Sequence, residues 1–156
     1  MHDLPRFKLI PAVHLFLTRD DQVLLLRRHN TGYEDGKYSV IAGHLDGDEE
    51  VTTAAIREAR EEAGIEIEPA DIAMVGVMHR RSPRPHAQDE RVDFFVRVTR
   101  WRGTLINAEP HKCAELTWCA LNHLPDDTIP YVRCALDNFR THDGVWFESF
   151  GWERYS

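Results

Sequence analysis

The stretch GHLDGDEEVTTAAIREAREEAGI, residues 43–65, decides the fold of this chain. Its second half has the spacing of a helix of about three turns. On such a helix Glu58, Glu61 and Glu62 fall on one narrow arc. The opposite side would let the helix lie close against a sheet, because its residues are small or apolar. That stripe consists of Thr52, Ala55, Ile56, Ala59 and Ala63.

Glycines mark both ends of this stretch. Gly64 predicts the end of the helix, because a glycine just after the last periodic residue can take the left-handed conformation that stops it. Gly43 and Gly47 bracket a loop whose backbone can bend sharply and approach a bound ion closely. The sequence therefore predicts a loop followed by a helix with one packed face and one acidic face.

The three glutamates on one arc predict a cation site. Like charges at these spacings repel by roughly a few tenths of a kcal/mol per pair, so stability alone would not favour them. Mg²⁺ or Mn²⁺ suits them, since both ions take carboxylate oxygens and keep open positions for water and phosphate. Taken singly, the same glutamates would be a solvated face paired with Arg57 and Arg60. The complete spacing favours the metal site.

This spacing resembles the signature of the Nudix hydrolases, G-x5-E-x7-R-E-U-x-E-E-x-G-U, where U is apolar. The matching positions are Gly43, Glu49, Arg57, Glu58, Ala59, Glu61, Glu62, Gly64 and Ile65. The resemblance implies an α/β/α sandwich around a mixed β-sheet. It also implies a scaffold role for Glu49 and Arg57, with Arg57 paired to a motif carboxylate, and a metal contact from the Gly43 carbonyl. The candidate catalytic residues are Arg57, Glu58, Glu61 and Glu62.

Length and composition fit one globular domain over residues 1–156. The chain is 42% apolar and 29% charged, which is ordinary for a soluble protein. No apolar run approaches the roughly 20 residues of a membrane span, and the first ten residues lack the apolar block of a signal peptide. We therefore expect a cytoplasmic protein without membrane contact. Its three cysteines fit neither a disulfide framework nor a zinc pattern, so reduced thiols are expected.

The net charge of -7 argues against a basic surface for nucleic acid. We therefore expect a small nucleotide as the binding partner and no stable nucleic-acid binding. A divalent cation would still allow an acidic protein to bind phosphate, because the charge of the ion is then part of the site. The oligomeric state is left open between a monomer and a homodimer.

Alternating apolar residues predict strands around the motif, and one later segment has a helical period. Before the motif we expect a hairpin from residues 7–18 and 22–28, a loop at 30–36 and a short strand at 37–42. After it we expect strands at 72–80, 91–101, 115–120 and 145–152, and a helix at 129–141. This order is consistent with helices on both faces of a mixed sheet.

Two features outside the motif have two interpretations each. Residues 81–88 are basic and interrupted by prolines, which suits either a flap that contacts phosphate or a solvated loop, and we favour the loop. Glu115 lies where many Nudix relatives carry a further acid near the metals, so it is a candidate metal ligand. It could equally be an exposed strand glutamate.

The nucleotide base must be bound outside the motif, because the motif contains no aromatic residue. Our candidate substrate-binding residues are Arg28, Tyr33, Tyr38 and His44. Trp118, Trp146 and Phe147 could also stack on a base, although aromatic residues in strands more often belong to the core.

The predicted reaction is Mg²⁺-dependent hydrolysis of a nucleoside diphosphate linked to another group. Bound Mg²⁺ can activate water, neutralise phosphoryl charge and stabilise the leaving phosphate. A nucleoside or deoxynucleoside triphosphate is the leading substrate. ADP-ribose or another nucleotide sugar is the alternative, because Pro83 lies near a position where relatives that cleave ADP-ribose often carry proline. A nucleotide-binding module without catalysis is disfavoured, since all motif glutamates are present. The general base is left open among those glutamates.

Overall fold

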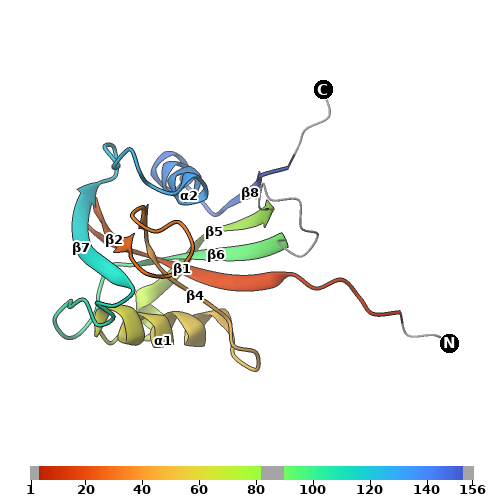
Figure 1. Cartoon of the computed structure of the whole chain (residues 1–156), viewed down its shortest axis with the longest axis horizontal. Helices are drawn as coiled ribbons and strands as arrows, with labels where there is room; N and C mark the ends of the chain where they lie inside the picture. The colour runs from red at the N-terminus through yellow and green to blue at the C-terminus, as the bar shows by residue number, and fades with distance from the viewer. Residues whose placement is uncertain (1–3, 82–89, 153–156) are drawn as a thin grey trace.

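The computed structural model describes residues 4–81 and 90–152. The strands are β1 (Ile10–Arg19), β2 (Gln22–Arg28), β3 (Tyr38–Ser39), β4 (Ile41–His44), β5 (Ile72–Arg81), β6 (Glu90–Val98), β7 (Cys113–Ala120) and β8 (Trp146–Phe150). The helices are α1 (Val51–Ala63) and α2 (Pro130–Thr141), with a short 3-10 helix at Pro69–Asp71. Figure 1 shows α1 on one side of the sheet and α2 on the other, which confirms the predicted α/β/α architecture.

The sheet is mixed, as predicted. Its strand order is β3-β2-β1-β6-β5-β8, with β4 paired to β1 and β7 paired to β2. β1 runs parallel to β6 and β5 runs parallel to β8, whereas the other pairs are antiparallel. One apolar cluster joins α1 to the sheet, and a second joins α2 to its other face.

The predicted hairpin forms only at its closed end. β1 and β2 are paired at Thr18 with Val23 and at Arg19 with Gln22, and then they separate. β1 continues between β4 and β6, while β2 continues between β3 and β7. The two halves of the sheet therefore separate beside the loop at residues 43–47, which is predicted to approach a bound ion.

The single strand predicted at residues 37–42 is two strands. Tyr38 and Ser39 pair with β2, whereas residues 41–44 pair with β1. Val40 lies between the two strands and is buried. The segment thus crosses from one half of the divided sheet to the other, which no local pattern of apolar residues indicates.

Helix α1 has the predicted end and the predicted packed face. Gly64 follows it with φ 66°, the left-handed conformation that stops a helix. Ala55, Ala59 and Ala63 are fully buried, while Thr52 and Ile56 are only partly covered. The small side chains allow α1 to lie close to β4.

Replacing Ala59 by phenylalanine should destabilise the protein by ~1 to 3 kcal/mol, because this face of α1 has no room for a ring. Thermal and urea unfolding would measure the loss. Thr53→Phe is the matched control, since Thr53 is on the exposed side of the same helix. Equal stability of the two variants would mean that the Ala59 face is not packed.

Three further expectations concern the remaining chain. Residues 82–88 and Pro83 lie outside the described residues. Cys113, Cys119 and Cys134 are free thiols. In the described part of the chain, neither helix is long and apolar enough to cross a membrane.

Candidate active site

A cavity of about 560 Å³ lies where β1 and β2 separate. Its walls come from β1, β2, β4, β5, β6, β7, α1 and α2, and from the loops after β2 and before β7. Pockets of this size accommodate ligands of nucleotide dimensions. The divided sheet therefore provides a place for a small-molecule substrate.

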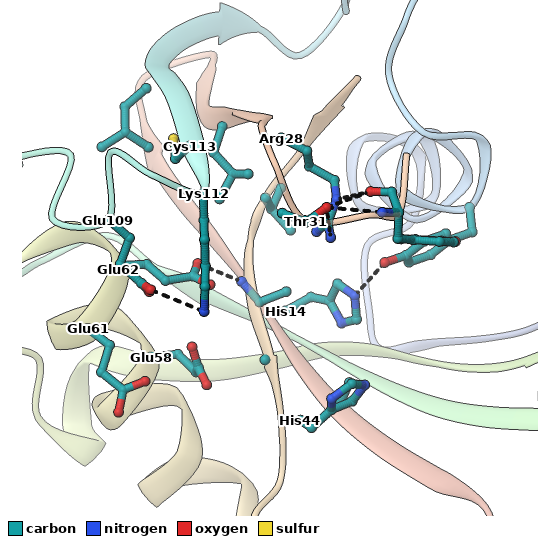
Figure 2. Close-up of a pocket in the computed structure, with 18 of the residues that line it drawn as sticks. His14, Arg28, Thr31, His44, Glu58, Glu61, Glu62, Glu109, Lys112 and Cys113 are labelled. Atoms are coloured by element: carbon teal, nitrogen blue, oxygen red, sulfur yellow. Dashed lines mark hydrogen bonds and ion pairs between the residues drawn. The ribbon is translucent and has the colours of Figure 1, made fainter. Parts of the chain in front are cut away.

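Four carboxylates line one end of this cavity. Glu58, Glu61 and Glu62 come from α1, and Glu109 comes from the loop before β7. Figure 2 shows the three helix glutamates on one side, with Glu109 and Lys112 reaching toward them from that loop. The Nζ of Lys112 lies 3.6 Å from Glu109. The structure thus gathers the three predicted glutamates with a fourth acid.

Arg57 lies behind this cluster and holds it in place. Its guanidinium donates to Glu49 at 2.7 and 3.2 Å and to Glu58 Oε1 at 2.7 Å. It also donates to the His44 carbonyl at 3.0 Å. Because Arg57 contacts both a motif carboxylate and the backbone beside Gly43, it fixes the helix relative to β4. It does not itself line the cavity.

Gly43 lies directly against the Glu58 carboxylate. A Cβ atom built on Gly43 would be 2.0 Å from Glu58 Oε1. A side chain at this position would have to displace the Glu58 carboxylate from its present place. The close approach brings the backbone of β4 to the edge of the acidic cluster.

Burial makes the two inner carboxylates difficult to ionise. Burial raises the pKa of Glu58 to about 7, although the hydrogen bond from Arg57 opposes the rise. Burial also raises the pKa of Glu62 well above its usual range, and the charge of Glu58 adds to this. A hydrogen bond from the Ala42 N–H, at 3.2 Å, partly stabilises the ionised Glu62. A divalent cation bound here would compensate the electrostatic repulsion between the ionised carboxylates of Glu58 and Glu62.

The donor set fits a hard divalent cation, but it is not arranged as a finished binding site. Across residues 4–81 and 90–152, no three His, Cys, Asp or Glu side chains converge as a metal site. Arg57 engages Glu58, and the Ala42 N–H engages Glu62. Buried, mutually repelling carboxylate oxygens are nevertheless the ligands that Mg²⁺ and Mn²⁺ prefer.

Glu115 and Tyr38 both lie outside the cavity, so Glu115 has the second of its two predicted positions, that of an exposed strand glutamate. The Tyr38 hydroxyl donates to Glu115, and neither residue lines the cavity. On β7 it is Cys113 and Leu116 that line the cavity, and a register shift between Arg27 and Arg28 interrupts the alternation between Cys113 and Glu115. The further acid at the cavity is Glu109. It lies in a loop, and the sequence of that loop has no regular apolar period from which its position could be predicted.

Three other predicted substrate-binding residues do line the cavity. They are Arg28, Tyr33 and His44. Arg28 donates to the Tyr33 carbonyl at 2.7 Å and to Thr31 at 3.0 Å, which shapes the loop after β2. Trp146 is buried in the core, and Phe147 is exposed outside the cavity.

The floor of the cavity contains residues that the sequence does not reveal. His14 Nε2 lies 3.0 Å from the Tyr131 hydroxyl, and burial lowers the pKa of His14 to about 4. Arg80 donates to the fully buried Asp93 at 2.7 Å and lies over the Tyr131 ring. These residues come from β1, β5, β6 and α2, so only the fold brings them together.

A family model described as the NUDIX domain matches residues 8–139 of the chain. The chain belongs to the Nudix family. Residues 43–65, with the carboxylates described above, lie inside the matched range.

Curated Nudix relatives have two kinds of activity. NAD-capped RNA hydrolase NudC of Pseudomonas aeruginosa (strain LESB58) is 36% identical over 87 residues, which are 56% of this chain and 28% of that protein. The chain thus corresponds to less than a third of NudC. CTP pyrophosphohydrolase of Escherichia coli (strain K12) is 27% identical over 83% of this chain and 87% of its own length.

Solved Nudix structures have the same fold. The crystal structure of MutT NUDIX hydrolase from Burkholderia pseudomallei has a TM-score of 0.75 and 25% identity, and the match covers 85% of this chain and 98% of that one. A structure described as ADP compounds hydrolase has a TM-score of 0.65 and 22% identity, covering 84% of this chain and 71% of that one.

Proposed function

We propose that this Nudix protein hydrolyses the diphosphate bond of a nucleoside diphosphate linked to another group. The observation that carries the proposal is the gathering of four carboxylates at one end of a cavity of nucleotide size. Glu58, Glu61, Glu62 and Glu109, with the Gly43 carbonyl, would hold Mg²⁺ or Mn²⁺. When bound, the cation supplies a nucleophilic water and neutralises charge on the phosphates.

The chain itself would provide proton transfer and orientation. Burial raises the pKa of Glu58 to about 7, which suits a group that accepts a proton near neutral pH. Glu61 and Glu62, on the same wall, are the other candidates for the general base. Arg57 would keep Glu58 in position through the hydrogen bond between them. Arg28 and Tyr33, on the opposite wall, would contact the nucleoside or its phosphates.

A nucleoside or deoxynucleoside triphosphate is the proposed substrate. It is supported by the match to CTP pyrophosphohydrolase over most of both chains. ADP-ribose, a nucleotide sugar or the NAD-like end of a capped RNA would use the same chemistry, and the match to NudC favours testing the last of these. We further propose a single domain over residues 1–156, because both helices pack on one sheet, and a monomer or homodimer in solution.

A substrate screen tests the proposal. Purified protein with Mg²⁺ would be given nucleoside triphosphates, ADP-ribose, nucleotide sugars and NAD, and the released phosphate and nucleotide products would be measured. We expect turnover of triphosphates that disappears with EDTA and returns with Mg²⁺. Tight nucleotide binding without turnover of any substrate would instead indicate a non-catalytic binding module.

Glu58 should make the metal-free protein less stable as pH rises. In the unfolded chain its carboxyl ionises near pKa 4.5, whereas in the folded protein it stays protonated up to about pH 7. Unfolding between these values releases a proton, so the free energy of unfolding falls with pH. Over this pH range the free energy of unfolding falls by about 3 kcal/mol in total. Melting temperatures in EDTA from about pH 5 to pH 8 would measure it.

The controls for this experiment are Mg²⁺ and Glu58→Gln. Mg²⁺ should raise the melting temperature more at the higher pH, where the carboxylates are ionised. The glutamine variant should keep the part of the pH dependence that Glu62 causes and lose the rest. An identical pH dependence in both proteins would contradict the burial of an ionisable Glu58.

Tyr33 and Tyr38 should differ in their effect on kinetics. Tyr33 lines the cavity, so Tyr33→Ala should raise KM more than it lowers kcat, because base stacking contributes equally to the ground and transition states. Tyr38→Ala should leave KM unchanged, since Tyr38 lies outside the cavity. Steady-state kinetics on the best triphosphate, with melting curves, would decide. A larger KM effect at Tyr38 would reverse our assignment.

A further inference from the structure

Arg91 lies at the beginning of β6 and lines the same cavity as the carboxylates. Its Nη1 is 3.0 Å from Nε2 of His44. A guanidinium can only donate hydrogen bonds, so this imidazole nitrogen must be the acceptor. The His44 ring is therefore neutral in this contact, with its hydrogen on Nδ1. His44 acts as a support that positions Arg91 without cancelling its charge.

Arg91 makes no ion pair with any carboxylate in the described part of the chain. Three other arginines lie near the site. Arg28 also lines the cavity without an ion pair among the described residues, but its guanidinium donates to the Tyr33 carbonyl and to the Thr31 hydroxyl. Arg57 is paired with Glu49 and Glu58, and Arg80 is paired with Asp93. The positive charge of Arg91 is therefore available to a ligand. A negatively charged group is the ligand that it would bind most strongly.

The position of Arg91 relative to the acidic cluster is fixed through β4. His44 directly follows Gly43, which lies against Glu58, and the His44 carbonyl accepts a hydrogen bond from Arg57. Figure 2 shows His44 at the edge of the cavity, away from Glu109 and Lys112. Arg91 therefore adjoins the end of the cluster at Gly43, on the side opposite the loop before β7.

We propose that Arg91, positioned by His44, binds a phosphate group that lies beyond the carboxylate cluster, so that the cavity selects nucleotides with three phosphates over those with two. The inference rests on the proposed function, in which the cluster engages the two phosphates of the scissile bond. A third phosphate next to them would reach the guanidinium. A diphosphate joined to a sugar presents hydroxyl groups there, which pair less strongly with a cation.

Binding of simple phosphates tests this selection independently of turnover. Calorimetry with Mg²⁺ present would compare inorganic triphosphate with pyrophosphate on the wild-type protein and on Arg91→Gln. We expect the wild type to prefer triphosphate, and Arg91→Gln to weaken triphosphate binding by roughly 10- to 100-fold with little change for pyrophosphate. Arg97→Gln is the matched control, because Arg97 is exposed on the same strand and does not line this cavity.

Two variants of His44 test its positioning role. His44→Gln retains a side-chain oxygen that can accept from Arg91, so the preference for triphosphate should be largely kept. His44→Leu removes the acceptor, so the preference should fall toward that of Arg91→Gln. An equal loss in both variants, with melting temperatures unchanged, would overturn the positioning role.

Kinetics then separate this proposal from the proposed function. On a deoxynucleoside triphosphate, Arg91→Gln should raise KM, whereas KM for ADP-ribose should change less than about twofold. Equal binding of triphosphate and pyrophosphate by the wild type would overturn the subsite even if the enzyme is active. A clear preference for triphosphate without any hydrolysis would uphold the subsite and overturn the proposed function.

Discussion

Glutamine in place of Glu62 should lower kcat by roughly 10²- to 10⁴-fold and leave the fold intact. Glu62 lines the acidic end of the cavity, and the neutral amide binds Mg²⁺ poorly and cannot accept a proton. Melting temperature should not fall, because the substitution removes a carboxylate that burial already disfavours. Glu61→Gln should also lower turnover by orders of magnitude, since Glu61 lies on the same wall.

The measurement is single-substrate kinetics at several Mg²⁺ concentrations, together with melting curves. Glu66→Gln is the control, because Glu66 pairs with Arg60 on the exposed surface and does not line the cavity. Rates near wild type for both Glu61→Gln and Glu62→Gln at saturating Mg²⁺ would rule out the acidic cluster as the metal site.

Asparagine in place of Asp93 should cost ~3 to 5 kcal/mol of stability. Asp93 is fully buried and accepts two hydrogen bonds from Arg80, at 2.7 and 3.4 Å. The amide cannot neutralise Arg80, which is itself only 6% exposed, so the variant leaves a buried charge without its partner. Urea unfolding would measure the loss.

The exposed pair Arg60 and Glu66 provides the comparison for this prediction. Both side chains are in contact with solvent, so Glu66→Gln should cost much less stability than Asp93→Asn. A loss at Asp93 no larger than that at Glu66 would mean that Arg80 can reach solvent when its partner is removed.

Helix α1 could be predicted in detail because all of its determinants are local. The stripe of alanines, the arc of glutamates and the final Gly64 all lie within residues 43–65. The existence of most strands could also be predicted from alternation. Their pairing could not, because the same apolar pattern fits a complete hairpin and one that separates after two residue pairs.

The same limit applies to the site. Glu58, Glu61 and Glu62 could be found because one helix carries them, whereas the cavity floor joins residues far apart in sequence, such as His14 and Tyr131. Glu115 had two interpretations that the sequence could not separate, and in the structure it is an exposed strand residue outside the cavity. Glu109 and Arg91 follow no period, so only tertiary structure brings them to the cavity.

The separation of β1 from β2 also bears on the order of folding. Pairs such as β2 with β3 are close in sequence, whereas β1 with β6 joins distant parts of the chain and must close a long loop. The cavity has walls from both halves of the divided sheet. A refolding chain should therefore regain its helical signal before it regains nucleotide binding. A truncated chain that lacks either half of the divided sheet should have no site at all.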